Sequence, residues 1–223
     1  MASGRSSASS KDHRKGRRED PPDVKLSKSL SYVCRHGAVK LGIQMDSGGF
    51  IDVDDLLRLP MFKDYKMEDI QRVVSNNSKQ RFALKQEPDS QKTFIRANQG
   101  HTVEVEELDL QPITSPSEAP TVVHGTYKRA WDSIKLQGLS KMKRNHIHFA
   151  PDIPGGNEVI SGMRHNCQIL IFIDLKKALE DGLSFYRSAN NVILSPGNSE
   201  GIILPKYFAQ VRELPSGKVL LQN

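Results

Sequence analysis

Residues 81–97 read RFALKQEPDSQKTFIRA, and they contain two short apolar runs separated by a polar loop. The runs 81–84 and 93–97 contain the aromatic and β-branched residues that favour strands, and Pro88 lies between them. This stretch predicts a β-hairpin.

Helical periodicity precedes the hairpin. Apolar residues recur every three or four positions in three stretches, which predict helices from an N-cap at Asp23 to Gly37, around residues 54–59, and over residues 67–74. Helices followed by a two-stranded hairpin are typical of a winged-helix lobe, a common arrangement in nucleic-acid-binding proteins.

After a stretch rich in Pro, Glu and Ser, the pattern changes to short β-rich runs. These runs lie at 122–123, 147–149, 169–173, 192–194 and 202–203, with helical stretches at 128–137 and 175–181. An α+β chain is therefore expected, without internal repeats. Its expected parts are a disordered basic tail (1–22), a winged-helix-like lobe that binds RNA or phosphate (23–110), a linker (111–120), a second lobe (121–214) and a C-terminal tail (215–223).

Charge and composition narrow the function classes. The 223 residues include 32 Lys and Arg against 26 Asp and Glu, and the net charge of +6 favours a polyanionic partner. The two cysteines, Cys34 and Cys167, form no CxxC motif, and the apolar run 169–173 is far too short to span a membrane. A protein of the cytoplasm or nucleus, without membrane attachment, is expected. Walker, HExxH and GxSxG motifs are absent from the sequence.

Arginine and histidine recur in five short segments: Arg35-His36, 79–81, 96–101, 124–126 and 144–148. In this order the segments resemble those of the RNA 2′-phosphotransferase family, and within it the animal members, over residues 23–214. The resemblance implies a winged-helix-like N-terminal lobe and a C-terminal lobe with the split β-sheet of ADP-ribosyltransferases, where NAD binds. It also implies a reaction in which NAD accepts a 2′-phosphate from spliced tRNA, giving nicotinamide and ADP-ribose 1″,2″-cyclic phosphate.

Four residues match the family's active-site set: Arg35, His36, Arg81 and Arg144. A phosphate monoester carries about −1.5 to −2 charge, and the planar guanidinium group binds its oxygens in pairs. Without the resemblance, ordinary explanations are available for the three arginines, namely a cation at a helix C-terminus, a cross-strand pair and a loop cation.

A second set of residues is assigned to NAD by the resemblance: His124, Gly125, Thr126, His148, Asn190 and Val192. Glycine would allow the ligand to approach the main chain, although a strand-end turn explains His124 to Thr126 equally well. Val192 falls where many ADP-ribosyltransferases have a catalytic Glu. A 2′-phosphate is already anionic and needs no general base to attack C1″, so a carboxylate is not required.

Further basic and polar residues are candidates for RNA contact: Arg96, Gln99, His101, Arg164 and His165. No metal site is expected. The predicted enzyme is a monomer that holds a 2′-phosphorylated RNA against NAD. Two alternatives stay open: an ADP-ribosyltransferase that stops after the first step, and a winged-helix RNA-binding protein with an inert second lobe.

Overall fold

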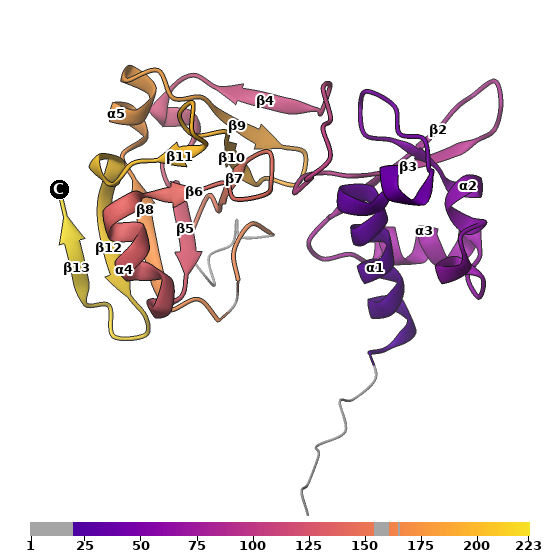
Figure 1. Cartoon of the computed structure of the whole chain (residues 1–223), viewed down its shortest axis with the longest axis horizontal. Helices are drawn as coiled ribbons and strands as arrows, with labels where there is room; N and C mark the ends of the chain where they lie inside the picture. The colour runs from indigo at the N-terminus through magenta and orange to yellow at the C-terminus, as the bar shows by residue number, and fades with distance from the viewer. Residues whose placement is uncertain (1–19, 154–160, 165) are drawn as a thin grey trace, which may run out of the picture.

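The computed structural model describes residues 20–153, 161–164 and 166–223. It is a mixed α/β structure with few helices and several small antiparallel sheets. Figure 1 shows two groups of elements side by side, which we call the N-terminal part (residues 20–97) and the C-terminal part (residues 110–223). The segment 98–109 joins them and is called the connector.

The N-terminal part contains three α-helices and a three-stranded sheet. The helices are α1 (Pro22–Tyr32), α2 (Val53–Leu57) and α3 (Met67–Ser75); the strands are β1 (Ile51–Asp52), β2 (Phe82–Gln86) and β3 (Thr93–Ala97), in the order β1-β3-β2. The predicted hairpin is confirmed, since Phe82 lies opposite Ala97 and Gln86 opposite Thr93. Fully buried side chains such as Leu26, Leu30 and Ile95 form a core between the helices and the sheet.

The first helix differs from its prediction at both ends. It begins at Pro22, where a missing N–H costs nothing, so the prediction of Asp23 as N-cap is wrong. Asp23 lies in the first turn and accepts a hydrogen bond of 2.9 Å from Arg72. Gly37 does not end the helix either, because the chain continues through a π-helical turn, Val33–Gly37, and a 3₁₀ turn to Gly42, whose φ of 69° is left-handed.

The C-terminal part is built mainly from strands. Its described residues form two four-stranded antiparallel sheets, β4-β9-β10-β7 and β13-β12-β8-β5, and a small two-stranded sheet, β11-β6. The helices are α4 (Lys128–Gln137) and α5 (Leu175–Glu180), and the strands are β4 (Leu110–Ile113), β5 (Val123–Thr126), β6 (Leu139–Ser140), β7 (Ile147–Phe149), β8 (Ile169–Ile173), β9 (Phe185–Ser188), β10 (Ile193–Ser195), β11 (Ile202–Ile203), β12 (Phe208–Glu213) and β13 (Val219–Gln222).

Several sequence predictions for this part are confirmed residue by residue, among them α4, β7, β8 and β11. Two expected boundaries differ. The linker expected over 111–120 contributes strand β4, because Ile113 is buried and the main chain pairs with β9. The tail expected over 215–223 contains β13, which pairs with β12. Of the basic tail expected over 1–22, residues 1–19 lie outside the described residues, and Pro22 already belongs to α1.

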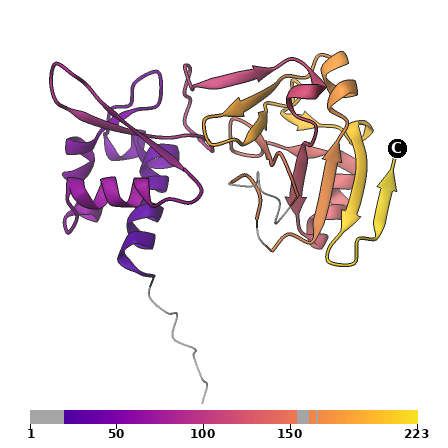
Figure 2. The ribbon, with the colours of Figure 1, turned by 180° about the vertical axis from the view of Figure 1, so that it is seen from behind.

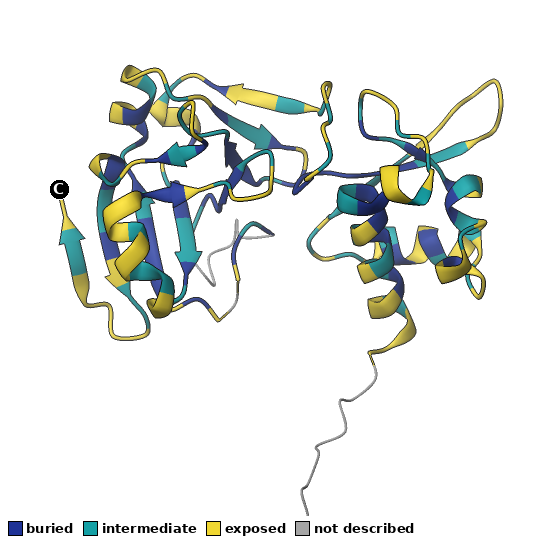
Figure 3. Ribbon diagram, viewed as in Figure 1, coloured by how far each residue is buried: buried dark blue, intermediate teal, exposed yellow. Residues whose placement is uncertain are grey.

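The connector is buried where it leaves the N-terminal part. Asn98, Gln99 and His101 expose 6%, 6% and 2% of their surface, and Figure 3 colours this stretch as buried between the two parts. The view from behind shows the same arrangement, with the connector passing between the two groups of elements (Figure 2). Within the described ranges, no helix is long and apolar enough to cross a membrane.

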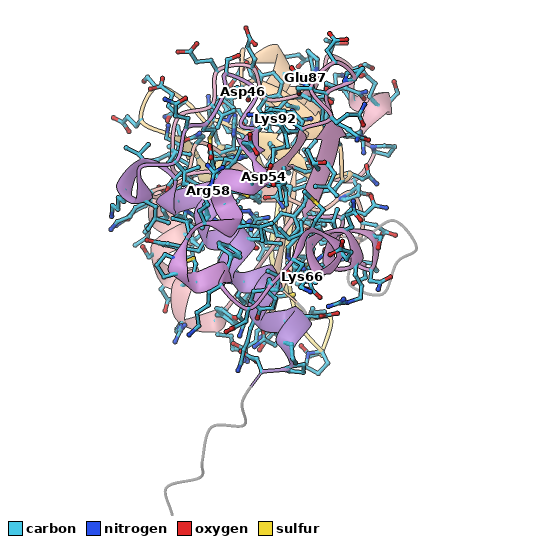
Figure 4. All side chains as sticks on the ribbon, turned by 90° about the vertical axis from the view of Figure 1, so that its right-hand side faces the viewer. Asp46, Asp54, Arg58, Lys66, Glu87 and Lys92 are labelled. Atoms are coloured by element: carbon cyan, nitrogen blue, oxygen red, sulfur yellow. The ribbon has the colours of Figure 1, made fainter. Side chains whose placement is uncertain are left out.

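The outer face of the N-terminal part carries charges of both signs. Figure 4 labels acidic and basic side chains distributed over it, among them Arg58 and Lys92. Arg58 pairs with Asp55 at 2.5 Å, and Lys92 pairs with Asp52 at 2.9 Å. These two cations are therefore compensated locally.

Candidate functional site

The π-helical turn positions Arg35 and His36 at the end of α1. A π turn shifts the helical hydrogen bonds by one residue, and such turns are frequent at functional sites. The N–H of Ala38 bonds to the carbonyl of Val33 at 3.2 Å, and the carbonyl of Arg35 accepts the N–H of Thr102 at 2.9 Å. The main chain of Arg35 is thereby joined to the connector.

The guanidinium group of Arg35 is buried without a protein acceptor. Its Nε and Nη2 atoms have no hydrogen-bond partner among the described residues. Burial, together with smaller effects of the neighbouring cations Arg144 and Arg81, lowers the pKa of Arg35 to about 10. Gly100, with a left-handed φ of +90°, packs against the group, and a Cβ there would lie 3.4 Å from Nε. Buried donors surrounded by cations are the arrangement expected of an anion site.

His36 is oriented by Thr102. Its Nδ1 lies 2.9 Å from the Thr102 hydroxyl oxygen, and that hydroxyl lies 3.3 Å from the Arg35 carbonyl. Since the hydroxyl can donate only one hydrogen, to Arg35, it accepts from Nδ1–H of His36. Burial, Arg35 and Arg144 lower the pKa of His36, which favours the neutral ring. The neutral ring then presents Nε2 as a hydrogen-bond acceptor.

Two asparagines hold Arg81 just before β2. Asn77 Oδ1 accepts from the Arg81 N–H at 3.2 Å and from Nη1 at 3.3 Å. Asn98 donates its side-chain amide to the carbonyl of Gln80 at 2.7 Å, and its main-chain N–H to the carbonyl of Arg81 at 2.8 Å. Gln80 has a left-handed φ of 44°. These bonds hold the main chain of Arg81 and one nitrogen of its side chain.

Arg144 comes from the C-terminal part, in the loop between β6 and β7. The next residue, Asn145, donates its main-chain N–H to the carbonyl of His101 at 3.1 Å and its amide to the carbonyl of Val103 at 2.9 Å. Burial lowers the pKa of Arg144, and Arg164 has a smaller effect in the same direction. The charges of Arg144 and Arg81 both lower the pKa of Arg35, so the structure brings these three arginines, from separate segments, close enough to interact electrostatically. We call them the arginine cluster.

The predicted NAD residues on β5 and β7 adjoin this cluster. His124 donates Nδ1–H to the carbonyl of His148 at 2.8 Å, which leaves its Nε2 as an acceptor. The Nε2 atom of His148 is buried and finds no partner among the described residues. Burial lowers the pKa of His148 to about 3, with smaller effects in the same direction from Arg144 and Arg35. The ring of His148 is therefore neutral and close to two of the arginines.

Gly125 has a structural reason to lack a side chain. A Cβ at this position would lie 2.6 Å from Met163 Cγ and 3.0 Å from Cys167 Sγ. These two side chains therefore pack against Gly125 on the side where a side chain would project. Thr126, the last residue of β5, is 7% exposed.

Asn190 and Val192 lie in the turn between β9 and β10, and both are buried in contact with other protein groups. Asn190 is 1% exposed, donates to the carbonyl of Lys79 at 3.0 Å and accepts from Ser188 at 2.9 Å. Val192 is completely buried. Asn190 thereby joins the C-terminal part to the turn that precedes Arg81. The contact of these two residues with NAD stays a prediction.

The residues expected to contact RNA separate into two groups. Arg96 is 8% exposed, lies over the Phe50 ring at 4.7 Å and pairs with Asp109 at 3.3 Å. Gln99 and His101 are buried in the connector. All three residues are therefore packed inside the protein. Arg164 is exposed and lies over the Tyr127 ring at 5.1 Å. His165 lies outside the described residues.

Four further residues shape the site without a clear mark in the sequence: Asn77, Asn98, Thr102 and Asn145. Asn98 and Asn145 lie inside segments that had been identified as basic, so their amides carried a weak signal. Thr102 carried none. Among the described residues, no three His, Cys, Asp or Glu side chains are grouped so that they could hold a metal ion.

Comparison with known proteins identifies the family. The model of the family described as RNA 2′-phosphotransferase, Tpt1/KptA, matches residues 21–197. The chain is 51% identical over 214 residues to tRNA 2′-phosphotransferase 1 of Bos taurus, covering 92% of this chain and 84% of the relative. It is 52% identical over 205 residues to the Homo sapiens protein of the same name, covering 91% of this chain and 81% of that protein. It is 40% identical over 185 residues to tRNA 2′-phosphotransferase of Saccharomyces cerevisiae, covering 79% of this chain and 80% of the yeast protein.

These matches span both parts of the structure and all four predicted catalytic residues. The chain therefore belongs to the RNA 2′-phosphotransferase family, Tpt1/KptA.

Proposed function

We propose that this protein is an enzyme that removes a 2′-phosphate from RNA with NAD as co-substrate, and that its RNA is spliced tRNA. The observation that carries the proposal is the cluster of Arg35, Arg81 and Arg144, in which two buried N–H donors of Arg35 have no acceptor among the described residues. A phosphate group supplies the acceptors and the negative charge that the cluster lacks. The bovine and human relatives are named tRNA 2′-phosphotransferase 1.

We assign the two substrates to the two parts of the chain. The N-terminal part would act as a winged-helix-like lobe that holds the RNA, and the C-terminal part as an ADP-ribosyltransferase-like lobe that holds NAD. The helices and hairpin that share one core, and the two antiparallel sheets whose buried residues belong to one other core, support these assignments. Because a single chain supplies both groups of residues, the proposed enzyme acts as a monomer.

The residues on β5 and β7 fit a nucleotide co-substrate. His148 has a buried Nε2 without a partner among the described residues, and the Nδ1 bond of His124 leaves its Nε2 free to accept from a hydroxyl group. Such acceptors suit ribose hydroxyl groups. NAD supplies a C1″ atom from which nicotinamide departs as a neutral molecule.

In the proposed first step, the arginine cluster holds the 2′-phosphate so that one of its oxygens bonds to C1″ while the bond from C1″ to nicotinamide breaks. The phosphate is already anionic and needs no base. Positioning is the main contribution of the protein, since holding two reactants in register replaces a bimolecular encounter.

In the second step, the 2″-hydroxyl attacks phosphorus and the 2′-oxygen of the RNA leaves. His36 can take the proton of the attacking hydroxyl on Nε2 and return it to the leaving oxygen, because Thr102 fixes its Nδ1–H tautomer. Arg35, Arg81 and Arg144 stabilise the negative charge that grows on the phosphoryl oxygens. The products are 2′-hydroxyl RNA and ADP-ribose 1″,2″-cyclic phosphate.

Incubation of the protein with NAD and an RNA oligonucleotide carrying one internal 2′-phosphate tests the proposal. Release of the cyclic phosphate supports it. A stable RNA adduct would instead favour an ADP-ribosyltransferase that stops after the first step, and unchanged RNA would favour an inert binding protein.

A further inference from the structure

A groove runs beside the arginine cluster on the N-terminal part. It has a volume of about 630 Å³, within the range of ligand-binding clefts, and lies between α1, α3 and the turn that leads into β2. Both His36 and Arg81 line it. The groove is therefore continuous with two of the four predicted catalytic residues.

The polar groups of the groove suit a nucleic-acid strand. Hydroxyl and amide groups line it, from Ser27, Ser31, Asn76, Asn77 and Ser78. The acidic residue in its lining, Asp23, is neutralised by Arg72 at 2.9 Å. Lys28 pairs with Asp20 at 2.5 Å, but both side chains are well exposed, so the pair is weak and can be exchanged for a phosphate contact.

Tyr32 provides an aromatic surface in the same groove. Tyr32 is 42% exposed, so the residue is open to solvent. The ring packs on Gly37, where an added Cβ would lie 2.7 Å from Tyr32 Cε1. Gly37 thus fixes the ring beside His36. Exposed rings next to phosphate-binding groups are a recurrent means of holding single-stranded RNA, because every base has a face that can stack.

We propose that this groove binds the nucleotide adjacent to the 2′-phosphorylated one, with Tyr32 stacking on its base and Lys28 contacting its backbone phosphate. The inference rests on the proposed function and adds a subsite to it. The groove belongs to RNA rather than to NAD because all its lining residues come from the N-terminal part, whereas His124 and His148 lie on the C-terminal part.

The test uses the full chain and a set of RNA oligonucleotides with one internal 2′-phosphate. In each oligonucleotide, one base flanking the phosphate is replaced by an abasic site. For the wild type, we expect kcat/KM to fall about tenfold or more at one flanking position. Tyr32→Ala should show a similar fall on the intact RNA and no further fall at that position, while Tyr32→Phe, which keeps the ring, should behave as the wild type does. Fluorescence anisotropy with labelled RNA and no NAD gives the same comparison for binding alone.

The charge contact is tested by salt dependence. Lys28→Ala should reduce the slope of log Kd against log salt by about one, as expected for one lost phosphate contact, and the matched exposed variant Lys63→Ala should not. This comparison remains available if Tyr32→Ala fails to fold.

Equal losses for Tyr32→Ala at every position, or equal slopes for Lys28→Ala and Lys63→Ala, would overturn the subsite. A rise in the KM of NAD without a change in RNA binding would assign the groove to the co-substrate, against the proposal. Failure of the proposed function is distinguishable, because the wild type would then release no cyclic phosphate while the binding comparison still reports on the groove.

Discussion

The side-chain amide of Asn190 donates a hydrogen bond of 3.0 Å to the main-chain carbonyl of Lys79, across 111 positions of sequence. This bond connects the β9–β10 turn of the C-terminal part to the turn that leads into Arg81. Asn98 holds the other side of the same turn. The position of Arg81 relative to Arg144 thus depends on a contact between the two parts of the molecule.

Replacing Asn190 by alanine should impair catalysis. The variant leaves the Lys79 carbonyl without its donor, a loss typically of about 1 to 3 kcal/mol for a buried group, and frees the turn that carries Arg81. We expect kcat/KM to fall on the order of tenfold or more, measured with 2′-phosphorylated RNA at saturating NAD.

Asn223→Ala is the matched control for this variant. Asn223 donates to the carbonyl of Phe208 at 2.7 Å, within the C-terminal part and away from the arginine cluster. Similar losses of stability in both variants, together with an unchanged kcat/KM for Asn190→Ala, would show that the bond between the two parts does not position Arg81.

Arg81→Lys and Arg144→Ala should separate the two chemical steps. The attack of the 2″-hydroxyl adds negative charge to the phosphoryl group, so the second step depends more steeply on the cations, and a lysine cannot provide the paired contacts of an arginine. A loss of about 2 to 3 kcal/mol would slow that step on the order of a hundredfold. Single-turnover reactions with labelled RNA should then show an ADP-ribosylated RNA band that is scarcely visible for the wild type.

If both arginine variants stop consuming RNA and the band never forms, the arginines act in binding or in the first step. Circular dichroism spectra that match the wild type are needed for either conclusion. Arg58→Lys is a suitable control, because Arg58 lies on the outer face labelled in Figure 4.

His101 should make the fold sensitive to acid. Burial lowers the pKa of His101 to about 4, with Arg35 adding in the same direction, whereas a histidine in the unfolded chain titrates near 6.5. Between these two values the unfolded state binds the extra proton, so the free energy of unfolding falls as the pH falls from about 6.5 to 4. The contribution from one such group is at most about 1.4 kcal/mol per pH unit.

Urea unfolding at several pH values would measure this effect. His101→Asn removes the titrating ring and should flatten the pH dependence over this window. A variant whose slope equals that of the wild type would mean that other groups, such as His148, account for the acid sensitivity.

Chelation of divalent cations should leave the activity in place. In the proposed mechanism the charge of the phosphate is neutralised by Arg35, Arg81 and Arg144, and phosphoryl transfer needs such positive charge wherever it comes from. Turnover with EDTA should remain within about twofold of turnover without it. Loss of activity that is restored by Mg²⁺, but not by K⁺ at equal ionic strength, would contradict this division of roles.

The elements that could be predicted from the sequence are those whose pattern is local. The hairpin and α4 follow from apolar periodicity alone. Strand β12 has no clear strand pattern in the sequence, because its pairing with β8 shifts register between Phe208 and Gln210 and the alternation of buried and exposed residues is broken there. Strand β4 resembles a linker in the sequence because it contributes only one deeply buried side chain, Ile113.

For the candidate site, the residue types in the sequence indicate the chemistry, but they do not indicate which residues contact one another. Arginine and histidine in five segments indicated a phosphate, whereas the convergence of Arg81 and Arg144 depends on pairing between distant segments. The role of Asn190 could not be foreseen, since its partner is a main-chain carbonyl that any residue at position 79 would provide. Thr102 orients His36 through a contact 66 positions away, and no local pattern marks it.

The π-helical turn Val33–Gly37 restricts where residues can be inserted or deleted in proteins of this family. Such a turn is equivalent to an α-helix with one inserted residue. Deleting a residue from it would restore the regular repeat and rotate all of α1 by about 100° relative to Arg35. Tyr32 and Lys28 would then point away from the arginine cluster while every side chain of that cluster remained in the sequence. Insertions and deletions should therefore be tolerated in the β2–β3 loop but excluded from these five positions, so that the spacing here is as much a requirement as the residues themselves.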